Sequence, residues 1–213
     1  MKTNSSKNIK AAITAVGGFV PKDFISNQDL EKVLDTTDEW ITTRTGIKKR
    51  RILKGEAKGT SYLAIKAAED LITKSNINPE TIDLVIVSTI TPDYKGAATA
   101  PSVASAINAK NAYAFDLSAA CSGFLYGMSS ATSYIESGRY NKILLIGADK
   151  MSSVVDYSKR ETSILFGDGA GAVLVEPSQN IYGWEDEYLR SDGIGAEWLM
   201  VKGGGSMYPM TQE

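Results

Sequence analysis

Short apolar runs constrain the fold of this chain more than any other feature of its sequence. Four runs are rich in valine and isoleucine and nearly continuous in apolarity, at residues 9–16, 84–89, 112–117 and 143–148, and a fifth at 170–175 alternates small and branched residues. Runs of this length and composition are typical of β-strands covered on both faces. The sequence therefore predicts a central sheet built from these five segments.

Amphipathic segments lie between the predicted strands. Residues 61–75 and 122–137 place their apolar side chains close to the 3.6-residue period of a helix, and Gly138 is well placed to end the second segment. Two short helices are expected at residues 27–34 and 37–43, the first capped by Ser26 or Asn27. Strands that alternate with helices predict an α/β fold with a largely parallel sheet.

Charge and hydropathy exclude several function classes. The 213 residues carry a formal net charge of -2, so the chain has no global attraction to nucleic acid. The sequence has no stretch that approaches the ~20 apolar residues of a membrane span. We therefore expect neither a nucleic-acid nor a membrane partner.

The counts of cysteine and histidine limit the chemistry. One cysteine allows no intramolecular disulfide and no cysteine-rich zinc site, and it fits a reducing compartment such as the cytoplasm. Histidine is absent from these 213 residues, which excludes a Ser-His-Asp triad or a Cys-His dyad built from them alone.

The single cysteine stands where a predicted strand meets a predicted helix. Cys121 lies in the segment Asp116-Leu-Ser-Ala-Ala-Cys-Ser-Gly123. A sharp turn of this kind lifts a nucleophile above the sheet, and the first turn of the following helix favours a thiolate. The alternative is that Cys121 is a small buried hydrophobic residue.

Two further patterns have both a functional and a structural interpretation. Trp40 and Arg44 are four residues apart on a predicted helix, so they face the same side. In the functional interpretation, Trp40 stacks a base and Arg44 pairs with a phosphate. In the structural interpretation, Trp40 is a core residue and Arg44 shields it from the surface. The basic run at residues 48–51 can attract a polyanion or an acidic carrier protein, but we expect a solvated surface.

A glycine-rich segment resembles a dinucleotide fingerprint without its context. Residues 166–172 read Phe-Gly-Asp-Gly-Ala-Gly-Ala, but they precede a predicted strand and open no helix. We therefore reject a Rossmann site and expect the glycines to let the backbone pass close to another segment. A P-loop motif is absent too.

Four segments in register resemble one enzyme family. They are Thr36–Ile47, Ala114–Phe124, Leu145–Asp149 and Ile164–Ala172. In this order and spacing the chain is similar to 3-oxoacyl-(acyl-carrier-protein) synthase III, the condensing enzyme that starts bacterial fatty acid synthesis. The resemblance implies a thiolase-like fold, in which this chain forms one half with a mixed, mostly parallel five-stranded sheet covered by helices.

The resemblance also implies a mechanism and partners. Cys121 would take the acyl group of an acyl-CoA and condense it with malonyl-acyl-carrier-protein, releasing CO2 and CoA. Trp40 matches the aromatic residue that stacks the adenine, Arg160 the arginine on its other side, and Arg44 and Thr36 the nucleotide and phosphate path. The family works as a homodimer, and no metal or redox cofactor is implied. The loop from Thr91 to Pro101 is expected to line the acyl pocket or a dimer interface.

The departure from the family lies in the missing residues. The family completes its site with a histidine and an asparagine from a second half. We expect residues 1–178 to form the half that carries the nucleophile and residues 179–213 to form a glycine-rich connector toward a missing half. The helix after Cys121 would then leave Phe124, Leu125 and Met128 partly uncovered, so the isolated chain should self-associate or be poorly soluble.

Three alternatives stay open. Within the same superfamily, the chain can be a starter-unit ketosynthase of a polyketide-type pathway or a hydroxymethylglutaryl-CoA synthase. The Trp40 and Arg44 segment favours the fatty-acid type, because it suits a primer delivered by CoA. The third alternative is a non-catalytic half-subunit or fragment.

Overall fold

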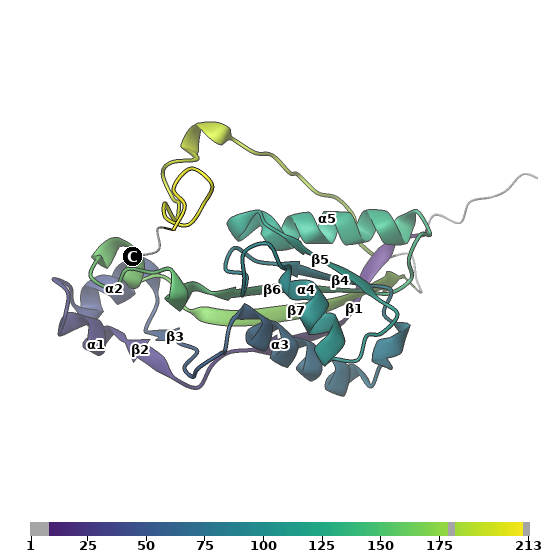
Figure 1. Cartoon of the computed structure of the whole chain (residues 1–213), viewed down its shortest axis with the longest axis horizontal. Coiled ribbons are helices and arrows are strands. Elements are labelled where there is room, and N and C mark those ends of the chain that lie inside the picture. The colour runs from purple at the N-terminus through teal and green to yellow at the C-terminus, as the bar shows by residue number, and fades with distance from the viewer. Residues whose placement is uncertain (1–8, 179–181, 211–213) are drawn as a thin grey trace, which may run out of the picture.

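The fold is built around one five-stranded sheet (Figure 1). The computed structural model describes residues 9–178 and 182–210. The strand order is β1-β7-β6-β4-β5, from β1 (Ala11–Phe19), β4 (Leu84–Ser88), β5 (Tyr113–Leu117), β6 (Ile143–Lys150) and β7 (Asp168–Pro177). All five predicted strands are present, with ends shifted by at most three residues.

The sheet is mixed, and four of its strands share one direction. Strand β4 pairs in parallel with both β5 and β6, whereas β7 is antiparallel to β6 and to β1. Because β7 alone is reversed, β1, β4, β5 and β6 run the same way. The α/β class with a mixed, mostly parallel five-stranded sheet is confirmed.

Helices cover the two faces of the sheet unequally (Figure 1). One face packs against α3 (Thr60–Ser75) and α4 (Thr99–Ala106) in a cluster with Val85, Leu144 and Leu174. The other packs against α5 (Gly123–Glu136) through Met128, Ala131 and Ile135. Strand β4 is buried at every position, which confirms cover on both sides at the centre of the sheet.

The remaining elements lie at one end of the sheet, beside β7 in Figure 1. A small antiparallel sheet pairs β2 (Phe24–Ser26) with β3 (Lys49–Arg51), and three short helices accompany it, α1 (Asn27–Glu31), α2 (Asp38–Thr45) and α6 (Arg160–Ser163). Ser26 caps α1 in a capping box with Asp29, as one of the two predicted caps. The predicted end at Leu34 was wrong, because α1 stops at Glu31.

Helix α4 was not predicted, because its cap is remote in sequence. Its N-cap is Ala98, which has no side-chain acceptor. The N–H groups of Thr99 and Ala100 instead donate to the carboxylate of Asp116 on β5, at 2.6 and 2.7 Å. The segment expected to be a loop from Thr91 to Pro101 is therefore a loop only as far as Ala98.

The basic run was misread as a uniformly solvated face. In β3, side chains alternate between the two sides of the strand, so Lys49 is exposed while Arg50 points inward and is only 2% exposed. The guanidinium of Arg50 donates two hydrogen bonds to Asn27 Oδ1, at 2.6 and 2.7 Å. A buried structural role for Arg50 replaces the prediction.

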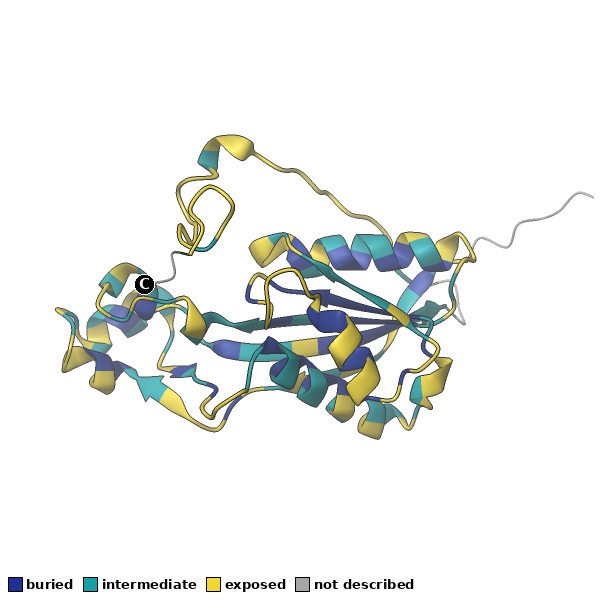
Figure 2. Ribbon diagram, viewed as in Figure 1, coloured by how far each residue is buried: buried dark blue, intermediate teal, exposed yellow. Residues whose placement is uncertain are grey.

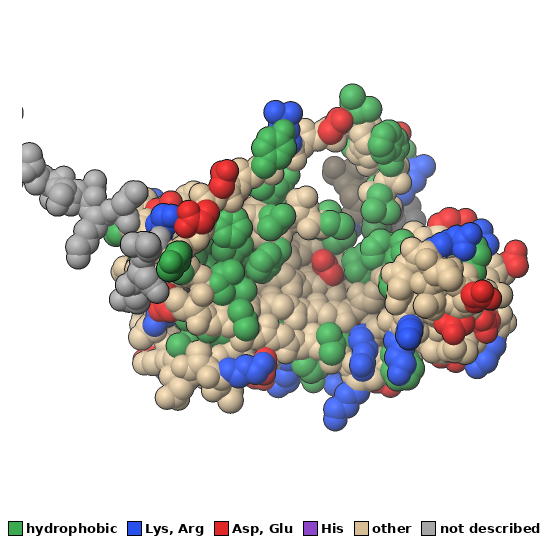
Figure 3. All heavy atoms as spheres, turned by 180° about the vertical axis from the view of Figure 1, so that it is seen from behind, with side chains coloured by type: hydrophobic (Ala, Val, Ile, Leu, Met, Phe, Trp, Pro, Cys, Tyr) green, Lys and Arg blue, Asp and Glu red, His purple; other side chains and the backbone are tan. Residues whose placement is uncertain are grey.

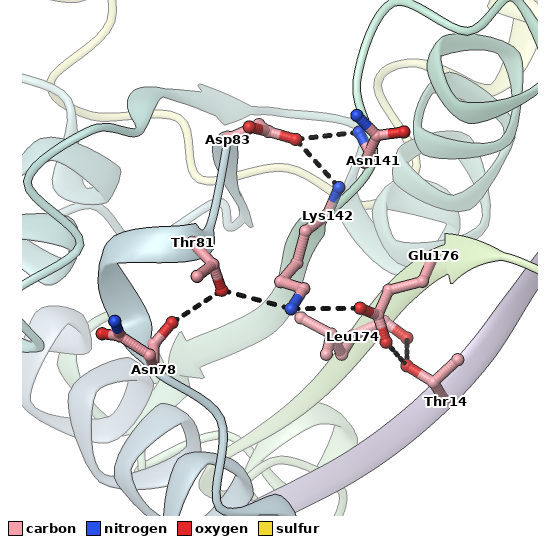
Figure 4. A network of polar contacts seen from close by, with 8 residues as sticks. All are labelled: Thr14, Asn78, Thr81, Asp83, Asn141, Lys142, Leu174 and Glu176. Atoms are coloured by element: carbon pink, nitrogen blue, oxygen red, sulfur yellow. Dashed lines mark hydrogen bonds and ion pairs between the residues drawn. The ribbon is translucent and has the colours of Figure 1, made fainter.

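Polar contacts tie the strands together at the start of β6 (Figure 4). Lys142 Nζ lies 3.2 Å from Glu176 Oε1 and donates to Thr81 Oγ1 at 3.1 Å. Glu176 also accepts a hydrogen bond from Thr14 on β1. The backbone N–H groups of Asn141 and Lys142 donate to Asp83 Oδ2. This network links β1, β7 and the start of β6.

The sheet face beside α5 is only partly covered. Exposed fractions are 46% for Ile13 and 60% for Val16 on β1, and 51% for Leu125 on α5. Figure 2 shows exposed positions on β1, β7 and α5, and Figure 3 shows hydrophobic side chains gathered on the body of the molecule below the tail. The expected cover on both faces is therefore incomplete for β1, where Ala11 packs with α5 but Ile13 and Val16 stay exposed.

The tail from residue 182 onward crosses over α5 (Figure 1). Its only regular element in the described residues is the short 3-10 helix η4 (Gly193–Gly195). Tyr126 OH donates to the carbonyl of Arg190 at 2.9 Å, and Ser129 Oγ to Glu187 Oε1 at 2.6 Å. No helix in the described part of the chain is both long and apolar enough to cross a membrane.

Candidate active site

Cys121 lies in the turn between β5 and α5. The turn contains the short 3-10 helix η2 (Ala120–Ser122), and α5 begins at Gly123. Ala120 has φ of 47°, a left-handed conformation that a residue with a Cβ adopts only under strain of about 1–3 kcal/mol. Cys121 is exposed, so it is not the buried hydrophobic residue of the alternative interpretation.

The start of α5 is held close to the sheet. Ser88 Oγ, at the end of β4, donates to the carbonyl of Gly123 at 2.9 Å. A Cβ on Gly127 would lie 2.6 Å from Leu145 Cδ1, so any larger residue here would require the buried Leu145 side chain to shift. The nucleophile is therefore carried by a turn that is fixed on both sides.

Two cavities meet at Cys121. The first, of about 370 Å³, is lined mainly by glycine backbone and by the ends of the strands, with Gly147, Gly167, Gly169 and Gly171. The second, of about 270 Å³, is mainly apolar and is lined by Ile90, Val154, Val155, Phe166, Leu199, Met200 and Val201. The thiol is thus reachable from a recess that admits a backbone or thioester and from a pocket that suits a hydrocarbon chain.

Asp149 lines both cavities beside Cys121. Its Oδ1 accepts hydrogen bonds from Thr89 Oγ1, Ile90 N and Thr91 Oγ1, each at 2.9 Å, and from Thr91 N at 3.2 Å. These donors fix the loop after β4 against the end of β6. Sequence reasoning did not single out this role, although Asp149 ends one of the four quoted segments.

A second cluster gathers around Trp40 on α2. The guanidinium carbons of Arg44 and Arg160 lie 4.3 and 4.8 Å from the centre of the Trp40 ring. Arg160, from α6, also donates to the carbonyl of Asp35 at 3.0 Å. Trp40 is half-buried against Leu30, Ile41 and Ile164, so it is neither a core residue nor a free surface ring.

Thr36 lies beside this cluster in sequence, next to the carbonyl that Arg160 binds. Its Oγ1 is buried and has no hydrogen-bond partner within the described residues. An unpartnered buried hydroxyl is uncommon in native proteins and marks a place where a ligand or water can supply the missing partner.

The structure brings together three of the five candidate residues, Trp40, Arg44 and Arg160. Cys121 lines separate cavities, and α6 connects the two places because Thr162 lines the apolar cavity beside Cys121, two positions after Arg160. Among the described residues, no group of three or more acidic, histidine or cysteine side chains is arranged to hold a metal ion.

The glycine-rich segment supports the backbone around the site. A Cβ on Gly167 would lie 3.0 Å from both the backbone N and the carbonyl O of Arg51, so the segment passes close to β3 as expected. Asp168, at the start of β7, is 4% exposed and accepts from Leu53 N at 2.7 Å and from Ser152 N at 2.8 Å. The segment leads into a strand, which is inconsistent with a dinucleotide fingerprint.

Known proteins share both the sequence and the fold. The sequence profile of the 3-oxoacyl-(acyl-carrier-protein) synthase III family matches residues 115–193. Beta-ketoacyl-(acyl-carrier-protein) synthase III of Chlorobaculum tepidum is 53% identical over 207 residues, which are 96% of this chain and 63% of that protein. The crystal structure of the corresponding synthase of Thermus thermophilus is 42% identical, with a TM-score of 0.83 over 87% of this chain and 57% of that one.

A related condensing enzyme also matches. The priming beta-ketosynthase of the R1128 polyketide pathway is 37% identical, with a TM-score of 0.76 over 80% of this chain and 51% of that one. The chain spans about 60% of the length of the curated relatives it matches. Over that share of their length, the chain is similar in sequence and in fold to 3-oxoacyl-(acyl-carrier-protein) synthase III enzymes.

Proposed function

We propose that this chain carries the nucleophile and the CoA-binding end of an acyltransferase that starts fatty acid synthesis. The enzyme condenses an acyl-CoA primer with malonyl-acyl-carrier-protein and releases CO2 and CoA. The observation that carries the proposal is the exposed thiol of Cys121 on a strained turn where two cavities meet. The names of the relatives supply the reaction class.

In the first step, the sulfur of Cys121 attacks the carbonyl carbon of the acyl-CoA thioester. The bond from that carbon to the CoA sulfur breaks, CoA leaves as its thiol, and the acyl group stays on Cys121. The backbone N–H of Cys121 is one donor to the oxyanion that forms on the way. The apolar cavity with Val155, Phe166 and Leu199 takes the hydrocarbon part of the primer.

In the second step, malonyl-acyl-carrier-protein loses CO2 and the resulting carbanion attacks the carbonyl carbon of the acyl-enzyme. The bond from that carbon to the sulfur of Cys121 breaks, which regenerates the thiol and leaves the 3-oxoacyl product on the carrier protein. The family resemblance assigns help in this step to a histidine and an asparagine of a second half. Histidine is absent from these 213 residues. We therefore propose that the chain by itself acylates Cys121 but does not complete the condensation.

At the other end of the substrate, Trp40, Arg44, Arg160 and Thr36 bind the nucleotide of CoA. An indole ring can stack an adenine, and guanidinium groups suit both the base and its phosphates. The support for this assignment is the gathering of two guanidinium groups on one indole, next to the unpartnered hydroxyl of Thr36.

The domain organisation is part of the same proposal. Residues 1–178 form the half with the nucleophile, and residues 179–213 connect it to a second half that packs on the uncovered sheet face beside α5. Support comes from the exposure of Ile13, Val16 and Leu125 and from the share of the relatives' length that the chain spans. Residues 1–8, 179–181 and 211–213 lie outside the described part of the chain.

The full enzyme is proposed to be a cytoplasmic homodimer. Strand β5 lies at the edge of the sheet, so one row of its backbone groups is open to a second copy. The lone, exposed cysteine fits a reducing compartment.

A second candidate function is a priming ketosynthase of a polyketide-type pathway. The match to the R1128 priming enzyme is the observation that favours it over a hydroxymethylglutaryl-CoA synthase. The two leading candidates share the chemistry at Cys121 and differ in the acyl group accepted.

Intact-protein mass spectrometry after incubation with acetyl-CoA and longer acyl-CoAs tests the proposal. The expected result is a gain of one acyl group that is absent from a Cys121→Ser variant and present in a Ser118→Ala control. The acyl-CoA that reacts fastest identifies the primer. If Cys121 stays unmodified with every acyl-CoA, even after a second half from a relative is supplied, the proposed first step is wrong.

A further inference from the structure

A buried arginine contacts the segments that carry the Trp40 cluster. Arg50 on β3 is 2% exposed, and its Nη1 and Nη2 donate to Asn27 Oδ1 at 2.6 and 2.7 Å. Its Nη1 also lies 3.4 Å from the carbonyl of Ile164, the residue that caps the end of α6. The guanidinium therefore contacts the helix that carries Arg160.

Asn27, the hydrogen-bond partner of Arg50, contacts the other helix, α2. Asn27 is fully buried, and its Nδ2 donates to Asp38 Oδ1 at 2.6 Å, to Ile47 O at 2.9 Å and to Thr42 Oγ1 at 3.2 Å. These acceptors span α2 from its first residue to the segment just beyond its end. One amide thus holds the whole helix that carries Trp40 and Arg44.

Burial of this charge is unfavourable by itself. Desolvation lowers the pKa of Arg50, while the charges of Tyr157 and then Asp38 raise it. Arginine nevertheless stays protonated in proteins, so Arg50 keeps its charge in the interior. A protein with an apolar side chain of similar volume at such a position is often equally stable. Its rigid planar fork supplies what an apolar residue lacks, a fixed geometry between two acceptors, Asn27 Oδ1 and the carbonyl of Ile164.

We propose that Arg50 and Asn27 form a positioning unit that sets the separation between α2 and α6, and with it the gap between the Trp40 ring and the Arg160 guanidinium. The inference rests on the proposed function, because it takes this gap as the site that receives the adenine of CoA. Arg50 acts through the two helices and does not touch the substrate.

Hydrogen exchange without ligand gives the first test. In Arg50→Lys the fork is lost and the charge kept, and in Arg50→Met both are lost. We expect amides of α2 and of Ser163 and Leu165 to exchange about tenfold faster together, as local opening becomes easier. The control is Arg51→Met on the same strand, whose guanidinium binds the carbonyls of Pro21 and Lys22 instead. If Arg50→Met does not fold, Arg50→Lys decides.

Faster exchange in one helix only, or in neither, would overturn the positioning role. So would an equal effect in the Arg51→Met control, because that result means general loosening. The hydrogen-exchange measurement uses no CoA, so it tests the positioning role of Arg50 even if the proposed function is wrong.

The second test is a double-mutant cycle read by CoA titration calorimetry. Arg50→Lys is expected to weaken CoA binding about tenfold, and to have no further effect in a Trp40→Ala background. The rate of Cys121 acylation at saturating acetyl-CoA should stay unchanged. An equal loss in both backgrounds would overturn the inference. Absence of CoA binding to the unmodified chain would instead count against the proposed function alone.

Discussion

The guanidinium carbon of Arg160 lies 4.8 Å from the centre of the Trp40 ring, although the two residues come from helices far apart in the sequence. A planar base between them needs about 3.5 Å on each side, or about 7 Å in total. The gap must therefore widen by about 2 Å when a nucleotide enters. In this structure Arg160 lies within cation–π distance of the ring on which a base would stack.

The first prediction concerns this cluster. Trp40→Ala should weaken binding of CoA about tenfold, because base–aromatic stacking contributes about 1–3 kcal/mol per base. Titration calorimetry with CoA measures the change. Tyr188→Ala is the matched control, since that ring is 78% exposed on the tail. Equal affinity of Trp40→Ala and the unmodified chain would contradict the assignment of Trp40 to the nucleotide site.

The second prediction concerns the contact between β1 and α3. A Cβ on Gly17 would lie 2.5 Å from Leu71 N and 2.7 Å from Leu71 Cβ, and it would also meet the carbonyl of Ala67. Backbone atoms cannot move aside as a side chain can, so Gly17→Ala should lower the free energy of unfolding by about 3 kcal/mol. Urea unfolding measures it. Gly171→Ala, where a Cβ meets nothing within 4 Å, should be nearly neutral, and similar midpoints for both variants would refute this account.

The third prediction concerns the remote cap of α4. Asp116 accepts from the first two N–H groups of the helix, and its negative charge lies at the positive end of the helix dipole. Asp116→Asn should destabilise the protein by about 1–2 kcal/mol. Amides of α4 should exchange faster while those of α5 stay protected. Asp186→Asn in the exposed tail is the control, and unchanged protection of α4 in Asp116→Asn would be the contrary result.

The sequence was sufficient for elements whose signals are local. The apolar runs predicted all five strands of the main sheet, and the 3.6-residue period predicted α3 and α5, because burial on a sheet or helix face repeats at a fixed spacing. The turn at Cys121 was predicted from the same local signals. Its exposure follows from the turn, since the strand ends before the cysteine and the helix begins after it.

Features that depend on distant partners escaped prediction. Helix α4 is capped by Asp116 on another element, and Arg50 is buried because Asn27 and Ile164 surround it. The apolar cavity at Cys121 is completed by Leu199, Met200 and Val201 from the tail, a segment without periodicity. In each case the deciding contact joins residues far apart in the chain, and no single sequence window contains both.

The fourth prediction is a pH dependence. In the capping box of α1, hydrogen bonds from the side chain and backbone of Ser26 lower the pKa of Asp29 to about 2. A carboxyl group whose pKa is lowered in the folded state stabilises the fold above its unfolded pKa near 4, and this contribution is lost as the pH falls toward 2.

Ser26→Ala should move the pKa of Asp29 back toward 3.8, as followed by NMR titration. Ser158→Ala, which removes a similar contact to Asp156, should leave Asp29 unchanged. Titration of Asp29 near 4 in the unmodified chain would disprove the cap's effect.

The fifth prediction concerns the uncovered sheet face beside α5. Val16 and Leu125 are 60% and 51% exposed, and cavities of about 410 and 540 Å³ continue the apolar surface along β1 and β7. An apolar surface of this kind favours association, so the chain should form species larger than a dimer in sedimentation velocity at micromolar concentration. The double variant Val16→Lys, Leu125→Glu should remove these species, since burial of two charges on contact is costly. Val33→Lys, at a 70% exposed position on the loop after α1, should leave these species in place.

Dimers that persist in the double variant would have to use another surface, for which the open edge of β5 is available. If the unmodified chain stays monomeric at all concentrations, the tail that crosses this face covers it well enough to prevent association, and the prediction is wrong.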